Sequence, residues 1–135
     1  MVEVSYFQQL LRAAAAEPEP QRLLFVFAGA ELPKHPTVEQ RERFNAGRGG
    51  ALAPLMCVDK APGDLADFDA LRAESRRAGP PWQVVFAAAL SGAEGRPPPK
   101  PHIDTALEKM VSAVTLGMVG RFAAFTEDGD PIQFR

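Results

Sequence analysis

The sequence contains a single cysteine, and this scarcity limits the chemistry open to the protein. One thiol cannot form an internal disulfide, so nothing points to an oxidising compartment. Cys57 lies within the apolar run 51–58, where a cysteine usually behaves as a small hydrophobic residue. Because a reactive thiol needs exposure and a nearby positive charge, we expect Cys57 to be buried and slow to react.

Histidine is also scarce, since the chain has only His35 and His102, far apart and near prolines. Neither has the spacing to a second ligand that zinc sites show. The sequence also shows no acid paired with a base and no nucleophile beside its base. We therefore predict no metal, no cofactor and no catalytic residues.

Long apolar runs are missing as well. No segment approaches the roughly 20 apolar residues of a membrane helix, and the N-terminus lacks the pattern of a signal peptide. With a net charge of −2, the chain lacks the basic surplus of nucleic-acid-binding domains. We expect a bacterial, cytoplasmic monomer whose partner is a protein or a small anionic ligand, with no nucleic acid or membrane partner.

The composition that remains is that of a globular protein. Hydrophobic residues make up 46% and charged residues 24% of the 135 residues. These fractions are close to the average of soluble domains, and the length suits one domain with a core of its own. We therefore expect a single globular domain over residues 1–135.

Helical and extended patterns alternate along the chain. Helices are predicted after Ser5, over 37–46, over 64–78, and from Asp104 or Thr105 onward. Strands are predicted in three segments whose faces are both apolar, 22–30, 51–58 and 82–90, and in a C-terminal hairpin formed by 121–125 and 131–134.

This alternation predicts an α/β fold, with α+β as the alternative. We expect a mixed sheet of about five strands, about four helices and the C-terminal β-hairpin in one domain. The pattern leaves open whether the first two strands are parallel or antiparallel.

Polar residues follow the three apolar strands at the points where they end. They are Glu31, Asp59, Lys60 and Ser91. Ligands of parallel sheets bind at the carboxyl ends of the strands, so these side chains would gather along one rim if the three strands are parallel. If the first two strands pair antiparallel, their ends diverge and the cluster dissolves.

A glycine-rich stretch around Arg48, AGRGG, is a second candidate. Here the glycines follow a predicted helix and precede a strand, which is the reverse of the order in phosphate-binding loops. The stretch therefore predicts a helix stop followed by a connector. The alternative is that Arg48 binds an anionic group of a ligand beside the rim.

Three stretches carry a resemblance to a known family: PQRLLFVFAGAELP, RFNAGRGGALAPLMCVDKAP and GDPIQFR. They are similar to a small proteobacterial family whose members are often labelled ribonucleotide reductase subunit alpha. The resemblance covers nearly the whole chain. It implies a fold, and no site residues carry over from it, because these stretches are not catalytic motifs.

These patterns favour a non-enzymatic binding or interaction module that uses the rim and the Arg48 loop as its contact surface. The alternative is a small enzyme acting on an anionic metabolite, with Asp59 as acid or base and Lys60 or Arg48 holding the negative charge. A role connected with ribonucleotide reductase ranks third, because one cysteine cannot supply a redox dithiol.

Overall fold

A five-stranded sheet forms the central layer of the computed structural model, which describes residues 4–31, 35, 37–45 and 51–134. The strands lie in the order β2-β1-β3-β4-β5, so β2 is an edge strand and β1 is interior. Their bounds are Gln21–Glu31 for β1, Ala51–Lys60 for β2, Val84–Ser91 for β3, Ala123–Thr126 for β4 and Pro131–Ile132 for β5.

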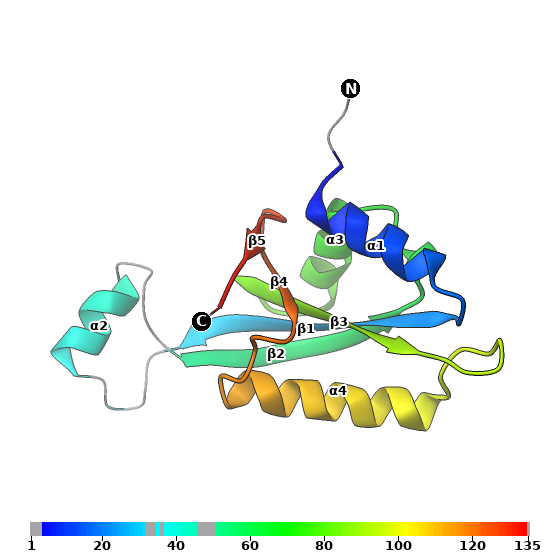
Figure 1. Ribbon diagram of the computed structural model, residues 1–135. Helices are drawn as coiled ribbons and strands as arrows, with labels where there is room; N and C mark the ends of the chain where they lie inside the picture. The colour runs from blue at the N-terminus through cyan, green and yellow to red at the C-terminus, as the bar shows by residue number, and fades with distance from the viewer. Residues whose placement is uncertain (1–3, 32–34, 36, 46–50, 135) are drawn as a thin grey trace.

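All four neighbouring strand pairs are antiparallel, so the expected mixed sheet is wrong. The connection from β1 to β2 explains the difference. A helix that crosses a sheet returns the chain parallel, whereas α2 (Val38–Asn45) stands away from the sheet, and the chain re-enters from the end at which it left (Figure 1). The chain combines helices and a sheet as expected, with the antiparallel sheet of the α+β alternative.

Three helices cover the two faces of the sheet. Helices α1 (Tyr6–Ala16) and α3 (Phe68–Ala78) lie on one face, and α4 (Lys100–Thr115) lies along the other (Figure 1). The C-terminal hairpin, formed by β4 and β5, is confirmed. Among the helices of the described segments, none is both long enough and apolar enough to cross a membrane.

Capping side chains determine where α1 and α3 begin. Ser5 caps α1 as predicted, and its hydroxyl oxygen accepts the Gln8 N–H at 3.1 Å. Helix α3 begins one turn later than predicted, because Asp67 caps it while Asp64 lies in the short 3-10 turn Pro62–Asp64. In both cases a short polar side chain satisfies an N–H group that the first helical turn leaves without a partner.

Helix α4 begins about one turn earlier than predicted. It starts at Lys100, directly after Pro99, and includes Pro101 in its first turn. Proline is compatible with this turn because the first N–H groups of a helix have no intrahelical acceptor. Asp104 and Thr105, the two predicted starts of this helix, therefore fall in its interior.

The sheet separates two apolar cores. The core under α1 and α3 is rich in aromatic rings, and its largest members are Phe7, Phe25, Phe27, Phe68, Trp82 and Phe125. The core under α4 is mostly aliphatic around one ring, with Leu24, Val26, Phe86, Leu107, Met110 and Val114 among its members. Successive residues of a strand point to opposite faces, so β1 supplies both cores.

Candidate functional site

The antiparallel sheet divides the predicted rim. Strand β1 ends at Glu31 opposite Ala51, whereas β2 ends with Asp59 and Lys60 beside the start of β1. Ser91 lies at this same end of the sheet, opposite Gln21. The structure therefore brings Asp59, Lys60 and Ser91 to one end and places Glu31 at the other, while Arg48 lies outside the described residues.

Asp59 and Lys60 occupy opposite faces of the sheet, because they are consecutive residues of β2. The Asp59 carboxylate accepts a hydrogen bond from Nε of Arg22 at 2.7 Å. The Lys60 ammonium donates to the Glu74 carboxylate of α3. These ion pairs join β2 to its neighbours in the fold, and ligand binding by Asp59 and Lys60 stays a prediction of the sequence.

A further cation lies near Asp59 in the first turn of α4. The hydrogen bond that Lys100 donates to Asp104 raises the pKa of this lysine, and the negative charges of Asp104 and Asp59 act in the same direction. Charges of both signs, from Arg22, Asp59, Lys100 and Asp104, therefore lie at this end of the sheet.

Cys57 is exposed, so the expectation of a buried thiol is wrong. Its partner across the ladder, Val26 of β1, is completely buried. Directly opposed residues share a face of the sheet, so the difference arises because β2 is the edge strand and has no strand on its outer side among the described residues. Pro54 within the apolar run 51–58 agrees with this position, because proline in a strand is confined to its start, a bulge or an edge.

We expect Cys57 to react with a thiol reagent in native buffer at a rate within a few-fold of the rate in denaturant, because the sulfur is open to solvent. Time-resolved labelling with an aromatic disulfide reagent measures both rates, and Cys57→Ser provides the blank. Native labelling slower by two orders of magnitude or more would contradict the exposed position.

An apolar groove with a volume of about 640 Å³ lies between α4 and β3. Helix α4 packs across β1 and β2 and leaves the outer part of β3 uncovered on this face. Apolar side chains form the groove, and they include Leu24, Ala88, Leu90, Met110, Leu116 and Phe122. We call this hollow the α4 groove.

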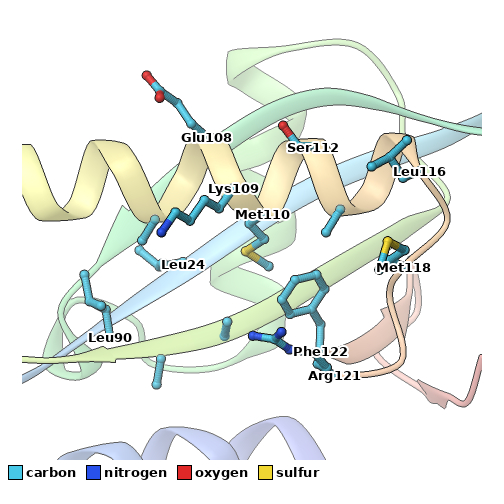
Figure 2. Close-up of a pocket in the computed structure, with 14 residues that line it drawn as sticks. Leu24, Leu90, Glu108, Lys109, Met110, Ser112, Leu116, Met118, Arg121 and Phe122 are labelled. Atoms are coloured by element: carbon cyan, nitrogen blue, oxygen red, sulfur yellow. The ribbon is translucent and has the colours of Figure 1, made fainter.

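Two cations flank the α4 groove. Figure 2 shows Lys109 descending from α4 toward Leu24, and the guanidinium of Arg121 beside Phe122 on the β3 side (Figure 2). Both side chains are exposed, and neither forms an ion pair with any residue in the described part of the chain. Glu108, the acidic residue of the lining, points away from the groove.

Two large apolar side chains at the end of the α4 groove face solvent. Leu116 is 71% exposed and Met118 is 68% exposed. Exposed apolar groups that cluster beside a hollow mark binding surfaces more often than isolated ones do. The α4 groove is therefore the candidate functional site of this fold.

The α4 groove was not predicted from the sequence. Leu107, Met110 and Val114 of α4 pack on the sheet as part of the core. Ala106 and Ala113 lie beside Met110, at the spacing of one helix face, and line the groove with it. Alanines contribute little to a hydrophobic pattern, so an apolar face wider than the core requires was the only available signal.

No group of three or more histidine, cysteine or acidic side chains within the described segments is placed to hold a metal ion. Comparisons of the chain with protein-family models, with curated proteins and with solved structures find no match. The α4 groove, described from its own side chains, is thus the basis for a functional assignment.

Proposed function

We propose that this protein is a non-enzymatic binding module that holds an apolar partner carrying a negatively charged group in the α4 groove. The observation that carries the proposal is the combination of an apolar hollow with two cations, Lys109 and Arg121, that have no carboxylate partner among the described residues. Each part selects a different property of the partner.

The apolar lining supplies the affinity. A volume of about 640 Å³ lies within the range of 300–1,000 Å³ that is typical of ligand sites. Each apolar group that moves from water into such a site gains roughly 25 cal/mol per Å² of buried surface. A partner that covers Leu116 and Met118 also removes their exposed surface from water.

The two cations supply selectivity for the negatively charged group. Exposed ion pairs contribute only about 0.2–1 kcal/mol each, but complementary charges speed association and exclude partners of the wrong sign. An enzymatic role for Asp59 has less support, because Arg22 holds its carboxylate and the α4 groove does not include it.

Anilinonaphthalene sulfonate is a suitable probe, because it joins an apolar ring system to one negative charge. We expect one saturable site per chain, and the double substitution Lys109→Gln, Arg121→Gln should weaken binding by roughly two- to thirtyfold, since two exposed pairs contribute about 0.4–2 kcal/mol together. Fluorescence titration measures the affinity, and thermal unfolding of each variant shows that it is folded.

Two matched variants test the location. Arg76→Gln, Arg77→Gln removes the same net charge from the exposed end of α3, and Asp59→Asn, Lys60→Gln removes the predicted rim. Both should bind the probe like the parent chain. Loss of binding in the rim variant alone would favour the Asp59 site, and the absence of a saturable site would refute the proposed function.

A further inference from the structure

Strand β3 is longer than β4, its neighbour on the outer side of the sheet. Its residues 84–87 pair with β4, and the last of these pairs joins Ala87 to Ala123. Residues 88–91 continue to pair with β1 on the inner side. On the outer side this half of β3 extends past β4 and has no strand partner within the described chain (Figure 1).

The backbone groups of this half of β3 have a defined direction. The N–H of Gly92 donates to the Pro20 carbonyl at 2.8 Å, so Gly92 faces β1. In an antiparallel ladder both polar groups of a residue point to the same side, and successive residues alternate. The N–H and C=O groups of Ala89 and Ser91 therefore point outward, away from β1.

Both faces of the sheet are hollowed at this edge. The α4 groove lies on one face, and a second hollow of about 210 Å³ lies on the other, under Leu10 and Ala13 of α1. Ala88 and Ala89 line both hollows, so the two meet at the free half of β3. A strand added here would send alternate side chains into the two hollows.

We propose that this half-edge of β3 binds an extended peptide segment of a partner protein as an additional antiparallel strand. Its side chains alternate between the α4 groove and the hollow under α1, and an acidic side chain follows at the β4 end. This inference rests on the proposed function and names its partner class. Strand addition gives affinity through the main chain, and pockets for alternate side chains give specificity.

The geometry defines the peptide in some detail. Pairing can extend over four residues, because Ala123 of β4 occupies the place opposite Ala87. Residues opposite Ala88 and Leu90 enter the larger α4 groove, and the residue opposite Ala89 enters the smaller hollow. Large apolar side chains therefore suit the peptide positions opposite Ala88 and Leu90, and a smaller apolar side chain suits the position opposite Ala89.

Charge complementarity favours a foreign peptide over a second copy of this chain. Arg121 lies just before the start of β4, at the end of the free half-edge, and Lys109 lies across the α4 groove. Two copies joined antiparallel through residues 88–91 would set the Ser91 end of one copy beside Arg121 of the other, and these four residues include no carboxylate to pair with it. An acidic peptide would place a carboxylate there instead.

The test uses a fluorescein-labelled, C-terminally amidated peptide, GSLVLDG, and fluorescence anisotropy with the full chain. Its serine aligns with Ser91, its valine with Ala89 and its aspartate with the Arg121 end. Methylation of the valine nitrogen removes the donor to the Ala89 carbonyl, and we expect it to weaken binding by at least about tenfold. Methylation of the following leucine nitrogen, which points away from β3, should leave binding nearly unchanged.

A charge exchange tests the orientation. Arg121→Glu should weaken binding of the peptide by up to about fivefold, and replacing the peptide's aspartate with lysine should restore it in this variant. Rescue supports the antiparallel placement, and its absence overturns it.

The outcomes separate this inference from the proposed function. Equal binding of the two methylated peptides, or no peptide binding beside intact binding of anilinonaphthalene sulfonate, overturns strand addition and leaves the α4 groove as a binding site. Loss of both ligands overturns the two together. A dimer in sedimentation that the peptide does not dissociate would make a second copy the occupant and would also overturn the inference.

Discussion

Replacing Phe7 with alanine is expected to lower the free energy of unfolding by about 3–5 kcal/mol, the usual cost of truncating a buried aromatic ring. Phe7 is completely buried in α1 and lies at the centre of the aromatic core. Its ring centroid is 5.2 Å from Phe68 and 5.4 Å from Phe125, both in edge-to-face orientation. The substitution removes these contacts and leaves a cavity that joins α1, α3 and β4.

Chemical denaturation monitored by the fluorescence of Trp82, which lies in the same core, measures this effect. Tyr6→Ala is a matched control, because it truncates the neighbouring aromatic residue, which is 65% exposed. It should change stability by no more than about 0.5 kcal/mol. A loss below about 1 kcal/mol for Phe7→Ala would mean that α1 does not hold the aromatic core together.

The elements of this fold were largely predictable because they depend on neighbouring residues. The Ser5 cap and the three apolar strands follow from signals within a few positions. Element ends were less predictable where two signals competed. Asp64 and Asp67 can both cap a helix, and the outcome depends on where α3 packs.

Strand direction was not predictable, because it depends on where the connecting segments pack. A helix between two strands suggests a crossover connection that makes the strands parallel. Helix α3 is such a connection, because β2 and β3 run parallel to each other with β1 between them. Helix α2 has the same position in the chain order but stands off the sheet. Its sequence is mostly polar, so it offers few apolar side chains that could pack on the sheet.

The candidate site could not be predicted from the sequence for a related reason. The rim hypothesis depended on parallel strands, and the antiparallel sheet separates Glu31 from Asp59. The exposure of Cys57 follows from strand order, for which Pro54 was a local signal that a bulge or a strand start would equally explain. The free half of β3 results from the difference in length between β3 and β4, and only the paired register reveals it.

The core beneath the α4 groove depends on one ring. Phe86 of β3 is completely buried, with its ring centroid 6.4 Å from that of Phe122 and 5.4 Å from that of Phe134. Phe122 in turn lines the α4 groove. The shape of the groove is therefore coupled to the packing of the core beneath it.

Phe86→Ala should cost about 3–5 kcal/mol of stability and should also weaken binding of anilinonaphthalene sulfonate, because Phe122 can settle into the vacated volume and deform the α4 groove. Phe7→Ala is the matched comparison, since it opens a cavity of similar origin on the opposite face of the sheet. Titrations of both variants are made under conditions where unfolding curves show that they remain native. We expect Phe7→Ala to bind the probe like the parent chain and Phe86→Ala to bind it several-fold more weakly. Binding like the parent chain by both variants would show that the groove keeps its shape without Phe86, and weakening in Phe7→Ala alone would place the probe on the opposite face of the sheet.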